Sequence, residues 1–150
     1  MMPVYDARVA IARHREIGPE LFTKIAIAVS MANECRYCTG AYASLLSGRL
    51  GDDEAVREFQ TSLARGDLSG READFVDFAL TLLEDPHELT DEDFASLRDA
   101  YGLTDRGFVG LFYAVNIVSG YNRITIGFDL EYDHSYPKRW ADPDAHEWQR

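Results

Sequence analysis

The sequence is poor in cysteine and in basic residues. Its 150 residues include two cysteines, and a chain of this length can bury a core as one domain without disulfide staples. Lys and Arg number 15 against 26 Asp and Glu, which gives a formal net charge of −11. Binding to nucleic acid requires a basic surface, and anionic membranes attract basic residues. We therefore expect neither as a partner.

Long hydrophobic runs are also missing. The longest apolar region, residues 108–118, is interrupted by Gly110 and Asn116, whereas a membrane helix needs roughly 18 apolar residues. The N-terminus lacks the basic start and apolar run of a signal peptide. We therefore expect a cytoplasmic protein, in which two closely spaced thiols indicate redox or metal chemistry rather than a structural staple.

No segment alternates with the period of a strand, whereas apolar residues recur at helical spacing. The pattern predicts an all-α fold of about six helices, in which Asn33 caps the second helix, Thr90 and Asp93 form a capping box, and Thr104 caps the last helix. The expected helices are 19–32, about 35–50, 52–64, 71–83, 91–101 and 105–127. Glycines in the last helix mark either close packing or a break.

The C-terminal tail has no helical period but carries two tryptophans and two prolines from residue 131 onward. We predict that it is irregular and docks on its own core or on a neighbouring subunit. No linker divides the chain, so residues 1–150 are expected to form a single domain.

Both cysteines lie in the stretch "NECRYCTGAYASLL", where Cys35 and Cys38 form a CxxC motif at the start of a predicted helix. Residues three apart share a helix face, and the positive end of the helix dipole favours thiolate over thiol. A thiolate attacks a peroxide oxygen or a disulfide sulfur, and a second thiol nearby then closes an intramolecular disulfide. The spacing suits such a cycle.

Two other interpretations of the cysteine pair remain open. A zinc site is disfavoured, because it needs four ligands and the histidines are scattered singly along the chain. No metal or cofactor is therefore expected. Buried cysteines can also simply pack as small hydrophobic residues.

The segment "KIAIAVSMANECRYCTGAYASLL" resembles the cysteine-containing helix pair of the carboxymuconolactone decarboxylase superfamily, in its alkylhydroperoxidase D-like branch. The segments "READFVDFALTLLEDPHELTDEDFASLRDAYGLTD" and "VNIVSGYNRITIGFDLEYD" resemble the second half of the peroxidase-related proteins of that branch. The resemblance covers about residues 19–133 and leaves 134–150 as a tail. It implies a helical bundle, usually a dimer, trimer or hexamer, that reduces peroxides or disulfides with electrons from a lipoyl or thioredoxin-like dithiol donor.

By this resemblance Cys38 is the attacking thiol, and the more exposed Cys35 closes the disulfide and meets the reductant. The sequence departs from the family pattern at the proton relay. The family has a glutamate twelve residues before the first cysteine and a histidine four after the second, where this chain has Thr23 and Tyr42. Some members also have a histidine between the cysteines, at the position of Tyr37. Tyrosine is a poor base at neutral pH, although the Tyr42 hydroxyl could bind the Cys38 sulfur.

Other polar residues near the motif have both a functional and a structural interpretation. Glu34 either relays a proton or is an acidic residue of the first helical turn that the positive end of the helix dipole stabilises. Arg36 either stabilises a thiolate or is a solvated surface charge. Asn122 and Arg123 either line the cleft or hold a contact between helices, and we favour the contact.

The sequence thus leads to two functional hypotheses. The first is an enzyme, a thiol-dependent peroxidase or disulfide oxidoreductase that cycles through Cys35 and Cys38. The second is a non-catalytic or redox-sensing oligomer that keeps the fold and the thiols but lacks the family's Glu and His.

Overall fold

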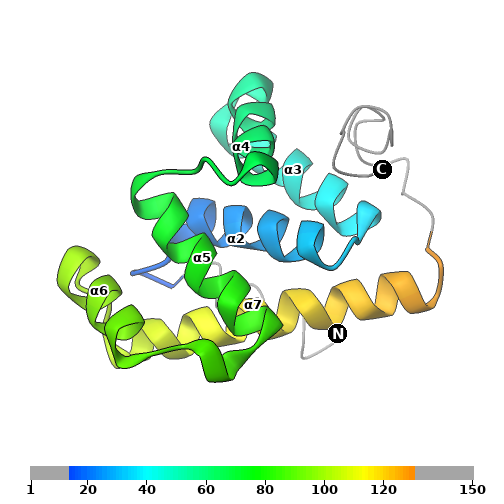
Figure 1. Ribbon diagram of the computed structural model, residues 1–150. Coiled ribbons are helices and arrows are strands. Elements are labelled where there is room, and N and C mark those ends of the chain that lie inside the picture. The colour runs from blue at the N-terminus through cyan, green and yellow to red at the C-terminus, as the bar shows by residue number, and fades with distance from the viewer. Residues whose placement is uncertain (1–13, 131–150) are drawn as a thin grey trace.

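A computed structural model describes residues 14–130 of the chain (Figure 1). The predicted all-α class is confirmed, and no strand occurs within this range. The prediction about the C-terminal tail lies outside the described residues. The helices are α2 Gly18–Ala32, α3 Arg36–Leu50, α4 Asp53–Arg65, α5 Gly70–Glu84, a short 3-10 helix Pro86–Glu88, α6 Asp91–Tyr101 and α7 Asp105–Gly127.

Helix α2 lies at the centre of the molecule, with α3 and α4 on one side and α7 on the other, while α5 crosses it (Figure 1). Every residue from Leu21 to Ser30 is buried, so α2 presents no solvent face over nearly three turns. Such a helix must be covered on all sides. Within the stretch, Lys24 forms ion pairs with Glu20 and with Glu72 of α5, which compensates its burial.

The predicted helix ends are confirmed where side chains cap them. Thr90 and Asp93 form the capping box of α6, and that helix ends at Gly102 in the left-handed conformation. The Thr104 hydroxyl accepts a hydrogen bond from the Gly107 N–H and caps α7. These short-range signals are strong because each satisfies backbone groups that the helix itself leaves unpaired.

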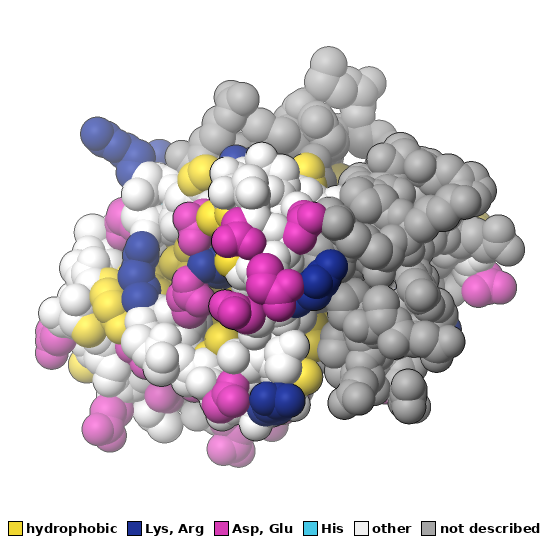
Figure 2. Space-filling model, turned by 90° about the horizontal axis from the view of Figure 1, so that it is seen from above, with side chains coloured by type: hydrophobic (Ala, Val, Ile, Leu, Met, Phe, Trp, Pro, Cys, Tyr) yellow, Lys and Arg dark blue, Asp and Glu magenta, His cyan; other side chains and the backbone are white. Residues whose placement is uncertain are grey.

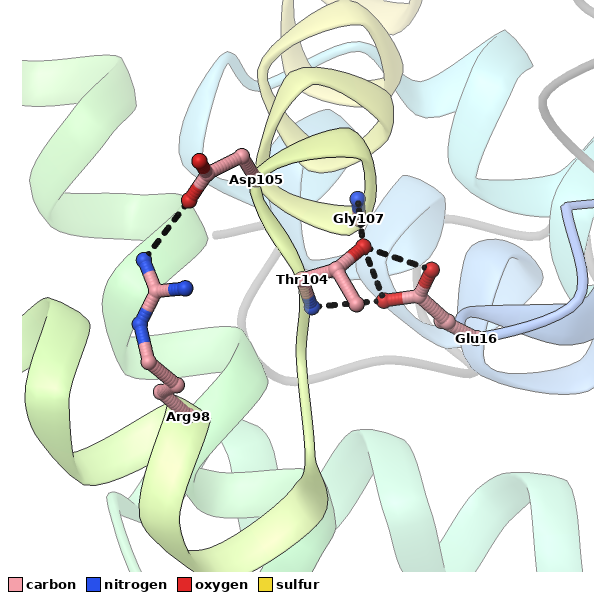
Figure 3. A network of polar contacts seen from close by, with 5 residues as sticks. All are labelled: Glu16, Arg98, Thr104, Asp105 and Gly107. Carbon is pink, nitrogen blue, oxygen red and sulfur yellow. Dashed lines mark hydrogen bonds and ion pairs between the residues drawn. The ribbon is translucent and has the colours of Figure 1, made fainter.

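The start of α7 is also bound to the segment before α2 through Glu16 (Figure 3). One Glu16 carboxylate oxygen accepts a hydrogen bond from the Thr104 N–H at 2.8 Å, and the other accepts one from the Thr104 hydroxyl at 2.9 Å. The backbone hydrogen bond from Thr104 is the main cause that holds the pKa of Glu16 below its ordinary value. On the opposite side Arg98 of α6 pairs with Asp105 at 2.8 Å. Glu16, which is distant in the sequence, and Arg98 of the preceding helix therefore both anchor the first turn of α7.

Two glycines of α7 mark close packing, which was one of the two predicted possibilities. A Cβ atom on Gly107 would collide with Glu16 and Leu103, and one on Gly110 would press on Ile17 at 3.3 Å. At Gly120 the corresponding space is empty. The helix continues unbroken through all three positions, so the predicted alternative of a break does not occur.

Acidic side chains gather on the face shown in Figure 2, with several Lys and Arg among them. This distribution agrees with the net charge of −11. Among the described helices, none combines the length and the apolar character that a membrane span requires.

Candidate active site

Cys35 and Cys38 are joined in a disulfide, with Cα atoms 5.3 Å apart. They are the two cysteines of the chain, so neither thiol is left free. The sulfurs lie where α2 turns into α3, beside the C-terminal part of α7, which is orange in Figure 1. The CxxC motif thus forms the bond that its spacing predicts.

The corner between α2 and α3 is tight because each of its residues is held by a backbone hydrogen bond. Glu34 adopts the left-handed conformation, with φ 56°, which is uncommon for a residue other than glycine. Its N–H donates to the Met31 carbonyl, and the Cys35 N–H donates to the Ser30 carbonyl, both at 2.9 Å. This is the Schellman pattern of a helix C-terminus, and it delivers Cys35 directly to the start of α3.

Cys35 then caps α3 with its own sulfur. The Cys35 Sγ accepts a hydrogen bond from the Cys38 N–H at 3.3 Å, as a serine or aspartate oxygen does at other helix starts. The sulfur therefore lies at the positive end of the helix dipole and receives a backbone donor. Both features stabilise a negative charge on Cys35 when the disulfide is opened.

Two predictions for this corner were wrong. Asn33 does not cap α3. The Schellman turn places Cys35 at the N-cap position of α3, and Asn33 is the C-cap residue of α2. Glu34 is not a first-turn acid, since it precedes the helix and its exposed side chain belongs to the corner. The predicted proton-relay role of Glu34 stays a prediction.

The hydroxyl of Thr125, on α7, lies 3.0 Å from the Sγ of Cys35 and 3.0 Å from the Sγ of Cys38. Thr125 is half-buried, and its hydroxyl also reaches the carbonyls of Tyr121 at 2.9 Å and Asn122 at 3.0 Å within its own helix. Sequence reasoning missed this residue. Its only sequence signal is a position three residues after Asn122, hence on the same helix face.

A buried polar network joins α2 to α7 one turn away from the sulfurs. Asn122 is fully buried, donates to the Ser30 hydroxyl at 3.1 Å and accepts from the Asn33 amide at 3.0 Å. The Asn33 amide also reaches the Ser119 hydroxyl at 3.4 Å. The preferred interpretation of Asn122 as a contact between helices is therefore confirmed. The network fixes the position of α7 along its axis relative to the cysteine corner and so positions Thr125.

Both sulfurs belong to buried residues, since Cys35 is 2% exposed and Cys38 4%. The expectation that Cys35 is the more exposed of the two is wrong. The reason is local: as N-cap residue, Cys35 tucks its side chain under the first turn of α3, where Thr125 covers it.

The positions that differ from the family relay are also buried. The Thr23 hydroxyl donates to the Pro19 carbonyl at 2.6 Å, inside its own helix, and only 3% of the residue is exposed. Tyr42 is 6% exposed and its ring meets Phe22 edge-on, with centroids 6.4 Å apart. The hydroxyl of Thr125 lies 3.0 Å from the Cys38 sulfur, and the predicted hydrogen bond from Tyr42 to that sulfur stays a prediction.

The remaining candidates differ in their exposure. Arg36 and Arg123 are exposed, and Tyr37 packs half-buried against the core. Within residues 14–130, no group of three or more His, Cys, Asp or Glu side chains is arranged to hold a metal ion.

A hollow of about 390 Å³ opens between α6 and α7 and is lined mainly by aromatic side chains, among them Phe94, Phe108 and Phe112. Its lining ends at Asn116, which lies about 13 Å along the helix axis from Thr125. No cysteine or histidine is among the described residues that line the hollow.

Comparison with solved structures defines the fold. An uncharacterized peroxidase-related protein from Silicibacter sp. TM1040 superposes with a TM-score of 0.74 at 20% identity, covering 87% of this chain and 71% of that one. The alkylhydroperoxidase AhpD core of a peroxidase-related protein from Ralstonia eutropha JMP134 gives a TM-score of 0.77 at 21% identity, covering 88% and 70%. The chain therefore has the alkylhydroperoxidase AhpD core fold, as the sequence resemblance implied. No family model matches the sequence, and no curated protein does.

Proposed function

We propose that the protein is a thiol-dependent peroxidase or disulfide oxidoreductase that cycles through Cys35 and Cys38. The observation that carries this proposal is the disulfide between them, at the N-terminus of α3, within an AhpD core fold. Peroxidase-related neighbours support a hydroperoxide as the oxidant. A lipoyl or thioredoxin-like dithiol protein is the proposed electron donor, and a homo-oligomer is the proposed assembly.

The oxidative half of the cycle consumes one hydroperoxide. The Cys38 thiolate attacks the outer peroxide oxygen, so that an S–O bond forms, the O–O bond breaks and the alkoxide leaves as the alcohol after taking up a proton. The Cys35 thiol then attacks the sulfenic sulfur, forming the S–S bond and releasing water. One dithiol and one hydroperoxide thus yield one disulfide, one alcohol and one water.

The reductive half returns two electrons to the pair. A thiolate of the donor attacks one sulfur of the disulfide, the other sulfur leaves as a thiolate, and the donor's second thiol resolves the mixed disulfide. If the donor attacks Cys38, the leaving thiolate is Cys35, which gains from the backbone donor and the helix dipole there; this geometry favours Cys38 as the point of attack, whereas the resemblance implied Cys35. The donor is oxidised to its own disulfide, so the cycle balances.

A second candidate is a redox sensor that forms the disulfide once and does not turn over. One observation favours it: the Thr23 hydroxyl is bound to the Pro19 carbonyl, and a threonine cannot supply the carboxylate that the family relay uses at this position. The two candidates share the disulfide and differ in rate. The sensor predicts slow oxidation without catalytic turnover.

Stopped-flow oxidation of the fully reduced protein by cumene hydroperoxide, followed by mass mapping of the products, tests this proposal. We expect fast loss of two thiols and a Cys35–Cys38 disulfide without over-oxidation. In Cys35→Ser the reaction should stop at a sulfenic acid on Cys38 that dimedone traps, and Cys38→Ser should lose the fast phase. Protein alkylated with iodoacetamide is the matched control for direct peroxide decay.

Oxidation no faster than that of a free thiol, or scattered sulfinic acids in place of the disulfide, would exclude the peroxidase. Fast disulfide formation that no dithiol donor can reverse in repeated turnovers would instead establish the sensor.

A further inference from the structure

The Thr125 hydroxyl has more acceptors within reach than it can serve. A threonine hydroxyl carries one proton, and in this structure four acceptors lie around it: the carbonyls of Tyr121 and Asn122 and the two sulfurs of the disulfide, all between 2.9 and 3.0 Å. Disulfide sulfurs bear no hydrogen, so the hydroxyl is the only possible donor in the two sulfur contacts.

The preferred acceptor changes with the redox state of the pair. A neutral sulfur is a weak acceptor, so in the disulfide state the Thr125 hydroxyl donates its hydrogen bond to a backbone carbonyl of α7. A thiolate is a charged acceptor, and hydrogen bonds to charged groups are about twice as strong as neutral ones. Since the hydroxyl rotates about a single bond, the proton can turn from the carbonyl to the sulfur without any movement of the helix.

We infer that Thr125 is a catalytic residue whose hydroxyl donates a hydrogen bond to the thiolate of the reduced Cys35–Cys38 pair. This inference rests on the proposed function. The Thr125 hydroxyl is the hydrogen-bond donor on the α7 side of the pair. On the α3 side, the Cys38 N–H donates a hydrogen bond to the Cys35 sulfur. The hydroxyl can receive the proton of the second thiol on its oxygen while donating its own. The reduced pair thereby holds one negative charge without a histidine at position 42.

The position of Thr125 is held by contacts that do not involve the sulfurs. Asn122, one turn earlier on α7, is tied to Ser30 and Asn33 of the cysteine corner. Removing the Thr125 hydroxyl therefore leaves the register of α7 against α2 in place. Thr125→Val keeps the shape of the side chain and removes the donor, and Thr125→Ser restores the donor.

Thr81 is a matched control. Its hydroxyl donates to the Asp77 carbonyl four residues earlier, at 2.9 Å, as that of Thr125 does to Tyr121, but it lies on α5 and contacts no sulfur. Thr81→Val thus removes the same kind of helix hydroxyl and shares any general effect on folding. Circular dichroism of each variant checks that the helices are retained.

The experiment measures the rate at which monobromobimane alkylates the reduced protein as a function of pH, which reports thiolate without any peroxide. In Thr125→Val we expect the pKa of the more acidic thiol to rise and the rate at pH 7 to fall roughly tenfold. Thr125→Ser and Thr81→Val should follow the wild-type profile. Equilibration in dithiothreitol buffers should show a more negative reduction potential for Thr125→Val, because the reduced form has lost a stabilising contact.

A Thr125→Val profile that coincides with the wild type would overturn the inference, as would a Thr125→Ser variant that fails to restore it. These outcomes are distinct from failure of the proposed function. If the wild type does not consume hydroperoxide, the peroxidase is excluded while the alkylation profile still decides the role of Thr125.

Discussion

At the scale of single residues, Cys35 performs two structural tasks and one chemical task. Its N–H completes the C-terminal turn of α2, its sulfur caps α3, and the same sulfur is half of the disulfide. A serine could perform the first two tasks, because serine is a preferred N-cap residue. Cys35→Ser therefore tests the chemistry with little disturbance of the corner.

Glu16 gives a residue-scale prediction about pH. Hydrogen bonds from Thr104 hold the pKa of Glu16 below its ordinary value, so its folded pKa lies below the unfolded one. Its contribution to stability is complete above the unfolded pKa, roughly 4.3, and is lost as the pH falls through the folded pKa. Glu16→Gln should therefore lower the free energy of unfolding at pH 7 by about 1 kcal/mol or less, since the carboxylate is partly solvated.

Urea unfolding at pH 7, 5 and 3.5 measures this difference between Glu16→Gln and the wild type, which should shrink at the lowest pH. Glu58→Gln, an exposed residue of α4, is the control and should change little at any pH. A difference that stays constant from pH 7 to 3.5 would show that the charge of Glu16 does not contribute.

Apart from Asn122, which stood out as a polar residue in an apolar helix, the residues that sequence analysis identified correctly have local signals. The CxxC spacing, the Thr90–Asp93 box and the Thr104 cap each depend on contacts within four positions of the chain. Thr125 was missed because its contact with the cysteines spans about 90 positions and arises only once α7 is packed beside the corner. Asn33 looked like a cap for the same reason, since its actual partners lie on α7.

At the scale of helices, the long helix α7 combines positions that demand glycine with one that does not. Gly107 leaves no room for a Cβ atom beside Leu103 and the Glu16 carboxylate, whereas Gly120 has open space. Glycine inside a helix costs about 0.5–1 kcal/mol relative to alanine, so only close packing justifies it.

Two alanine substitutions in α7 should therefore have opposite signs. Gly107→Ala should lower the free energy of unfolding by about 1–3 kcal/mol, because the new methyl group displaces Leu103 and breaks the Glu16 contacts with Thr104. Gly120→Ala should raise it by about 0.5–1 kcal/mol through helix propensity. Chemical denaturation followed by circular dichroism measures both, and effects of the same sign would contradict the close approach of Leu103 and Glu16 to Gly107.

At the scale of the whole molecule, the helical class and the order of the helices were predictable because the apolar periodicity is strong in each segment. The packing arrangement was not, since the sequence does not say which helix is covered on every side. Uninterrupted burial from Leu21 to Ser30 identifies α2 as that helix. The depth of the disulfide follows from it, because the cysteine corner begins where this buried helix ends.

Reduction of the disulfide should leave the molecule folded. The bond closes a loop with a sequence separation of 3, which restricts the unfolded chain very little, and the core rests mainly on the packing of α2 against α3, α5 and α7. We expect the free energy of unfolding to fall by about 2 kcal/mol or less on reduction. Urea titrations of oxidised and dithiothreitol-reduced protein measure this difference, and a collapse of the helical signal on reduction would contradict both the prediction and a reversible cycle.

The corner between α2 and α3 has a consequence for the lengths that this chain can tolerate. Three residues, 33–35, connect the two helices, and backbone hydrogen bonds hold the N–H of each of them. An insertion or deletion before Cys35 would turn α3 about its axis by roughly 100° and carry the Cys35–Cys38 pair away from Thr125. The connection 66–69 between α4 and α5 also begins with backbone hydrogen bonds, from the N–H groups of Gly66 and Asp67, but it lies outside the cysteine corner, so an added residue there leaves the register of α3 unchanged. A change of length between α4 and α5 is therefore compatible with the redox pair, whereas a change of length between α2 and α3 is not.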